Sequence, residues 1–150
     1  MSFVVPFDGS RLARTALSRA GYLGAQCGIP VLAVTVLPED TDYARKRDWL
    51  DPGEQFDADR IEDRLREQVH GIAPDATFQC HRVRRRLDYG AIARIVRDTA
   101  ERAGADVVFL GSENVGRIAK PISSIGGNVA ARVDYDIYLV QKASESGATA

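Results

Sequence analysis

The chain is poor in the residues that mark a disulfide scaffold, a metal centre or a membrane protein. It has two cysteines, two histidines and one tryptophan. Cys27 and Cys80 are far apart and lack metal-ligand spacing, which is typical of a reducing compartment. No apolar run approaches the roughly 20 residues that span a bilayer, and the chain starts with a strand-like segment in place of a leader peptide. We therefore expect a cytosolic protein without a membrane partner.

Neither sign of charge dominates. The chain has 20 Lys and Arg residues against 21 Asp and Glu residues, so no bulk field is available to hold a polyanion. One short run is basic and consists of Arg82, Arg84, Arg85 and Arg86. No aromatic residues alternate with these arginines to stack bases. We therefore expect no nucleic-acid partner.

A length of 150 residues with 45% apolar residues is enough for one sizeable core. We expect a single domain over residues 1–142, followed by a small polar tail, residues 143–150, that is disordered.

Five short apolar runs alternate with helical patterns along the chain. The runs predict strands at Phe3–Pro6, Val31–Leu37, Phe78–Val83, Val107–Leu110 and Ile137–Val140. Apolar residues three or four apart predict helices at Leu12–Cys27, Ala58–Gly71 and Ile92–Ala103, the first and third ended by Gly28 and Gly104. Asp8 or Ser10 would cap the first helix. The alternation indicates right-handed crossovers and a parallel, doubly wound α/β sheet.

Two segments depart from this pattern. Residues 38–57 carry many charges, two prolines and the lone Trp49, and we interpret them as an exposed excursion with one short helical turn, the best candidate for a lid or variable loop. The run at Phe78–Val83 is polar for a strand, because Gln79, His81 and Arg82 would be awkward at the centre of a sheet. We therefore place it at an edge.

The functional end should lie beyond the carboxyl ends of the strands, where ligands sit in open parallel sheets. The first strand ends in Pro6-Phe7-Asp8-Gly9-Ser10, and the fourth runs into a Gly/Ser-rich loop from Gly111 to Gly127. Glycine amides, serine hydroxyls and the N-terminus of a following helix are donors that suit an anion. The loop is also long for a plain connection. We expect a ligand there.

The segments Val5–Ser10 and Ala105–Ser112 resemble the universal stress protein family, and the likeness spans nearly the whole chain. The resemblance implies a five-stranded parallel sheet in the order 3-2-1-4-5, with the third and fifth strands at the edges. Many members of that family bind ATP through a motif written G-x-x-G, nine residues, then G-S or G-T.

The match to this ATP motif is imperfect. Counted from Gly111, the second glycine falls on Asn114 and the third on Ser124, with Ser123 beside it. Asparagine is the best non-glycine residue where φ is positive, so Asn114 can keep the turn. A second register uses Gly116 and Gly126-Gly127, but it stretches the first gap and shortens the closing helix. We prefer the first register, which gives a closing helix over Ile125–Val133.

The resemblance implies a role for each residue of the site. Pro6, Phe7 and Asp8 form the first loop, in which Asp8 would face the ribose, and Val36 would offer backbone groups to adenine. For Asp8 a plain capping role stays open. Contacts to the ribose and the first phosphate would come from Leu110, Gly111, Glu113 and Asn114. Phosphates would be held by Ser123, Ser124, Ile125 and Gly126, with Arg117 or Lys120 neutralising their charge.

We thus expect a sensor or regulator that binds ATP or another adenine nucleotide, with Mg²⁺ accompanying ATP. No nucleophile and general-base pair stands out, and His70 and His81 are interpreted as surface residues, so any ATP hydrolysis would be slow. One alternative is a degenerate member that acts as a dimeric interaction module. Another is an enzyme of the adenine nucleotide alpha hydrolase-like fold, for which Glu113 is the only candidate metal-holding acid at the loop.

The last strand, Ile137-Tyr138-Leu139-Val140, is apolar on both faces, while the resemblance leaves it with an unpaired edge. A second copy of the chain would cover that edge and the tyrosine together. We therefore expect a homodimer that pairs through this strand.

Overall fold

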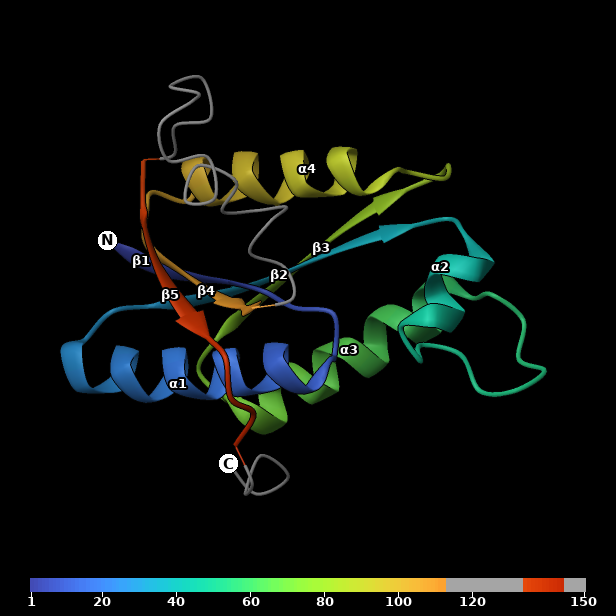
Figure 1. The fold of residues 1–150 in the computed structure, drawn as a ribbon. Coiled ribbons are helices and arrows are strands. Elements are labelled where there is room, and N and C mark those ends of the chain that lie inside the picture. The colour runs from blue at the N-terminus through green and yellow to red at the C-terminus, as the bar shows by residue number, and fades with distance from the viewer. Residues whose placement is uncertain (113–133, 145–150) are drawn as a thin grey trace.

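The computed structural model describes residues 1–112 and 134–144. The described chain is an open sheet with helices on both faces (Figure 1). Its elements, in chain order, are β1 (Ser2–Pro6), α1 (Arg11–Cys27), β2 (Val31–Pro38), α2 (Thr41–Lys46), α3 (Ala58–Ile72), β3 (Thr77–Val83), α4 (Tyr89–Arg102), β4 (Ala105–Gly111) and β5 (Asp136–Val140). The predicted closing helix over Ile125–Val133 and most of the predicted polar tail lie outside the described residues.

The five strands are parallel and follow the order β3-β2-β1-β4-β5, as predicted. The chain builds outward from β1 to β3 and then crosses back to place β4 on the other side of β1. The strand order therefore reverses at β1. In a doubly wound sheet, this reversal opens a crevice at the carboxyl ends of the strands.

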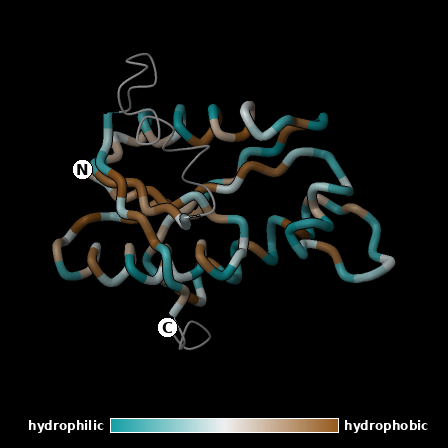
Figure 2. Tube along the Cα trace, in the orientation of Figure 1, coloured by the Kyte–Doolittle hydropathy of each residue, from teal (hydrophilic) through white to brown (hydrophobic). Residues whose placement is uncertain are grey.

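Alternate residues of the central strands supply two cores. Val5 and Phe109 pack with Leu17 of α1 and Val69 of α3 on one face of the sheet. On the other face, Val4, Val108 and Leu110 pack with Val96 of α4, among others. Figure 1 shows α1 and α3 below the sheet and α4 above it. Figure 2 shows the apolar residues gathered along the central strands, as burial on both faces requires.

The strand β3 lies at an edge, as its polarity predicts. Arg82 of β3 pairs with Asp59 at 2.7 Å and with Glu62 at 2.9 Å, both from α3. These ion pairs keep the polar side chains of the edge strand at the surface, where their charges remain partly hydrated.

The excursion between β2 and α3 contains the expected short helix, α2, but the prediction of full exposure is wrong. Tyr43, Ala44, Trp49 and Leu50 are buried and pack with Leu37 and with Ile61 and Leu65 of α3. Aromatic and apolar residues in an otherwise charged segment therefore anchor it to the body of the molecule. No helix in the described part of the chain is long and apolar enough to cross a membrane.

Candidate functional site

The strand β1 ends before β2 does, and this difference leaves backbone of β2 facing a gap. The pairing of β1 with β2 ends at Pro6 opposite Val34, and the amide of Phe7 then donates to the carbonyl oxygen of Val34 at 2.7 Å. In a parallel ladder every second residue directs its N–H and C=O toward the same neighbour. Val36 therefore turns these groups toward β1 at a point that lies past the end of that strand.

The loop after β1 is fixed by hydrogen bonds to its backbone and side chains. The Oδ1 atom of Asp8 accepts from the amide of Ser10 at 2.9 Å, and Gly9 has a φ of 82°, which favours glycine. The cap of α1 is Ser10, whose hydroxyl accepts from the amide of Ala13 at 3.3 Å. The cap of α1 is thus Ser10 and not Asp8. The second carboxylate oxygen of Asp8, Oδ2, lies 3.9 Å from Nε of Arg47.

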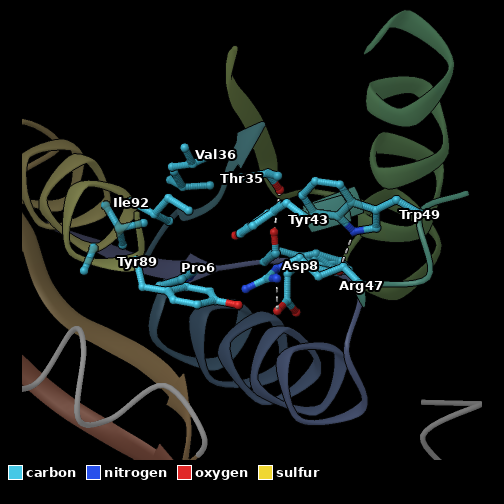
Figure 3. A pocket seen from close by; sticks show the side chains of 13 residues that line it. Pro6, Asp8, Thr35, Val36, Tyr43, Arg47, Trp49, Tyr89 and Ile92 are labelled. Carbon is cyan, nitrogen blue, oxygen red and sulfur yellow. Dashed lines mark hydrogen bonds and ion pairs between the residues drawn. The ribbon is translucent and has the colours of Figure 1, made fainter. Parts of the chain in front are cut away.

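A cavity of about 60 Å³ lies at these strand ends, and we call it the strand-end cavity. Four elements contribute to it (Figure 3). Its lining consists of Pro6, Phe7 and Asp8 after β1, Val34, Thr35 and Val36 of β2, Tyr43, Arg47 and Trp49 of the α2 segment, and Tyr89, Ile92, Ala93 and Val96 of α4. The structure thus brings four of the predicted site residues, Pro6, Phe7, Asp8 and Val36, to one hollow.

Aromatic side chains that the sequence reasoning missed form one wall of this cavity. The indole Nε1–H of Trp49 donates to the carbonyl oxygen of Asp8 at 2.8 Å, so the α2 segment is tied to the β1 loop. The ring of Tyr43 packs edge-on against Trp49, with centroids 5.6 Å apart. In the same cavity, the hydroxyl of Thr35 donates to the carbonyl oxygen of Phe7 at 2.5 Å. The one available signal in the sequence was the presence of Tyr43 and Trp49 in a charged segment, which indicates anchoring but not the cavity that they line.

The other predicted residues lie at the neighbouring strand end or outside the described chain. Leu110 is buried in the core under α4, and Gly111 pairs with Val140 at the end of β4. The strand β1 lies between β4 and β2, the strand that carries Val36. Neither residue lines the strand-end cavity. The remaining predicted residues are not among those described, namely Glu113, Asn114, Arg117, Lys120, Ser123, Ser124, Ile125 and Gly126.

An ion-pair cluster braces the segment that carries the aromatic wall. Arg64 of α3 holds Glu54 through two hydrogen bonds of 2.8 Å and also donates to the carbonyl oxygen of Trp49 at 3.1 Å. Arg60 adds a contact of 3.1 Å to Glu54. Hydrogen bonds from Arg64 and from the Asp51 amide lower the pKa of Glu54 to about 2. The Glu54 carboxylate and the Arg64 guanidinium therefore both remain charged near neutral pH.

The titratable residues near β3 do not supply a nucleophile. Burial raises the pKa of Cys80 to about 12, with the neighbouring Glu62 carboxylate acting in the same direction, so the thiol stays protonated. His81 is half-buried, which corrects the expectation of a surface residue, and burial lowers its pKa. Its Nε2 lies 3.2 Å from the hydroxyl of Thr99. His70 is exposed, as expected.

Metal ligands are not grouped in the described part of the chain. No set of three or more His, Cys, Asp or Glu side chains there is arranged to hold a metal ion. At the strand ends, residues 1–112 and 134–144 offer backbone donors and acceptors at Val36, a carboxylate at Asp8 and aromatic faces.

Comparison with known proteins places this arrangement in a family. Residues 1–141 match the model of the Universal stress protein family. No curated protein sequence matches the chain. The fold resembles that of a universal stress protein from Archaeoglobus fulgidus in complex with dAMP, with 20% identity, a TM-score of 0.60, and coverage of 94% of this chain and 98% of that one.

Two further solved structures share the fold. A universal stress protein in complex with cAMP is 20% identical, with a TM-score of 0.55 and coverage of 94% and 96% of the two chains. The universal stress protein UspA from Lactobacillus plantarum is 16% identical, with a TM-score of 0.54 and coverage of 94% and 97%.

Proposed function

Because this chain belongs to the universal stress protein family, we propose that it binds an adenine nucleotide beyond the carboxyl ends of β1, β2 and β4 and acts as a sensor or regulator. The observation that carries the proposal is the backbone of Val36, which faces an aromatic-walled cavity past the end of β1. A flat heteroaromatic base has a hydrogen-bond donor and an acceptor on one edge, and its two faces are apolar. The backbone of Val36 can pair with the edge, and the aromatic and apolar side chains of the lining can pack against the faces. Two structural neighbours are universal stress proteins in complex with cAMP and with dAMP.

Each part of the nucleotide has a proposed partner. The edge of adenine meets the N–H and C=O of Val36, and its faces meet the apolar and aromatic lining from α2 and α4. Asp8 accepts from a ribose hydroxyl through the carboxylate oxygen that does not bind Ser10. Leu110 and Gly111, at the end of β4, begin the loop that we propose for the phosphates, together with residues 113–126.

The finer assignments rest on the sequence. We propose ATP, with Mg²⁺, as one ligand of this class, and a protein that works in the cytoplasm without substantial catalysis. The described residues near the cavity supply contacts for binding but no paired nucleophile and base, so turnover should be far below ordinary enzyme rates.

One specific observation favours a second candidate function. The strand-end cavity holds about 60 Å³, whereas pockets for small molecules usually hold roughly 300 to 1,000 Å³. A family member that no longer admits nucleotide would work as a dimeric interaction module. The two candidates differ in whether any adenine nucleotide binds.

Titration calorimetry with AMP, cAMP and ATP, the last with and without Mg²⁺, separates them. The matched variants are Ile92→Trp, which fills the strand-end cavity, and Ile95→Trp, which places the same bulk on α4 away from the lining. We expect at least a tenfold loss of affinity for Ile92→Trp and little change for Ile95→Trp. No heat of binding for any of the three nucleotides at millimolar concentration would favour the interaction module.

A further inference from the structure

Arg47 lies between two hollows of different character. On one side is the strand-end cavity. On the other is a groove of about 610 Å³ beside the first turns of α1, which we call the α1 groove. Both hollows are lined by Asp8, Arg47 and Trp49. The Arg47 side chain therefore forms part of the partition between them, and rotation about its own bonds can carry the guanidinium from one to the other.

In the structure, the guanidinium of Arg47 is stacked among aromatic rings. Its central carbon lies 3.6 Å from the centroid of the Tyr43 ring and 5.6 Å from that of Tyr89. The side chain is only 16% exposed. Figure 3 shows the guanidinium between the Tyr43 ring and the carboxylate of Asp8. A planar cation on a tyrosine face gains both electrostatic attraction and ring contact.

One hydrogen-bond donor of the Arg47 side chain is left without a partner among the described residues. The Nε atom of Arg47 is buried without a hydrogen-bond partner among the described residues, and its nearest carboxylate oxygen, from Asp8, is 3.9 Å away. A buried donor without a partner carries a desolvation penalty. The guanidinium is thus held mainly by ring faces and charge, which a ligand with its own flat ring can replace.

The same position is the one that a base would need. Tyr43 and Tyr89 have ring centroids 6.2 Å apart, and the guanidinium lies by both rings in the cavity that Val36 also lines. With Arg47 in place, about 60 Å³ remains, which suits a few water molecules and is too little for a purine.

We infer that Arg47 is an internal plug: its guanidinium covers the face of Tyr43 beside Tyr89, where the base would stack, and a nucleobase binds only by expelling it into the α1 groove. The inference rests on the proposed function, since it concerns the same cavity and the same class of ligand.

The α1 groove makes the expulsion sensitive to phosphate. Three more cations line the groove, Arg11, Arg14 and Lys46, and none has an ion-pair partner within residues 1–112 and 134–144. Two carboxylates, Asp8 and Asp48, line the groove as well, so the three cations leave it with an excess of positive charge. Moving the guanidinium of Arg47 into the groove is therefore opposed by charge repulsion. A ligand that brings its own negative charge offsets this cost, whereas a neutral nucleoside does not. The plug therefore selects phosphorylated over unphosphorylated adenosine.

The test is a titration of adenosine and of AMP into the wild type, Arg47→Ala and Arg45→Ala. Arg45 is exposed on the same short helix and is the matched control. Without the plug, we expect adenosine to bind at least tenfold tighter and the ratio of the adenosine Kd to the AMP Kd to fall at least threefold. Arg45→Ala should match the wild type in both. Arg47→Ser repeats the truncation, and thermal unfolding of each variant establishes that it is folded.

The possible failures are distinguishable. If AMP binds the wild type while Arg47→Ala and Arg47→Ser bind adenosine no tighter, the plug is overturned and the proposed function stands. If both variants lose AMP affinity, Arg47 is a ligand contact and the plug is again overturned. If neither ligand binds the wild type, Arg47→Ala or Arg47→Ser at millimolar concentration, the proposed function fails and the plug fails with it.

Discussion

At the strand ends, the carboxylate of Asp8, the backbone of Val36 and the side chains of the α2 segment line one cavity. Asp8 and Val36 could be predicted because a loop after a first strand and the end of a second strand must meet at the same edge of a parallel sheet. Tyr43, Arg47 and Trp49 could not, because their positions depend on how the α2 segment docks on α3. That docking follows from long-range contacts such as the bond from Trp49 to Asp8, which no local period encodes.

At this scale, the brace on the aromatic wall predicts a dependence of stability on pH. Hydrogen bonds from Arg64 lower the pKa of Glu54 from its ordinary value of 4.5 to about 2. Because the folded state binds this proton less readily than the unfolded state, Glu54 stabilises the fold fully above its unfolded pKa. That contribution is lost as the pH falls from about 4.5 toward 2. We expect Glu54→Gln to lower stability at neutral pH and to approach the wild type near pH 2 in urea unfolding.

The matched control for this prediction is Glu67→Gln. Glu67 is exposed on α3, the helix that carries Arg64, and makes no ion pair with the described residues. Its substitution should leave the profile of stability against pH unchanged. Equal slopes for the wild type and Glu54→Gln between pH 5 and pH 2 would contradict the assignment of the brace.

Both edge strands, β3 and β5, have an outer side without a partner strand in the described chain, and β5 is the more apolar of the two. It pairs with β4 and stands at the end of the sheet. Tyr138 stacks on Phe109, with ring centroids 4.8 Å apart, and remains 36% exposed. An apolar, unpaired strand edge is a site of association unless something covers it. We therefore keep the proposal of a homodimer through Ile137, Tyr138, Leu139 and Val140.

This proposal predicts the effect of a charge on the edge. Tyr138→Lys should shift the protein from dimer to monomer in sedimentation velocity, because lysine on an exposed edge strand opposes pairing. Tyr22→Lys, which alters a tyrosine that is 60% exposed on α1, should leave the dimer intact. A wild-type monomer, or a Tyr138→Lys variant that remains dimeric, would refute pairing through β5.

For the whole molecule, the sheet order and the position of the site follow from the sequence more directly than the shape of the cavity does. The polarity of β3 predicts its place at an edge, and the apolar run Val31–Leu37 predicts a strand covered on both faces. The full strand order could be predicted because the resemblance to the universal stress protein family implies it. The volume at the strand ends depends on side-chain packing among β1, β2, α2 and α4. A guanidinium stacked in that volume is a tertiary feature that sequence spacing does not specify.

The most direct test of nucleotide binding at the strand ends uses the single tryptophan of the chain. Trp49 lines the strand-end cavity, and its indole N–H donates to the carbonyl oxygen of Asp8. Because the chain has one tryptophan, the indole N–H cross-peak in a ¹H–¹⁵N spectrum reports on this cavity alone. We expect AMP to shift this indole resonance in a saturable way in the wild type. If millimolar AMP leaves the Trp49 indole resonance of the wild type unmoved, the proposal that an adenine nucleotide binds at the strand ends is contradicted.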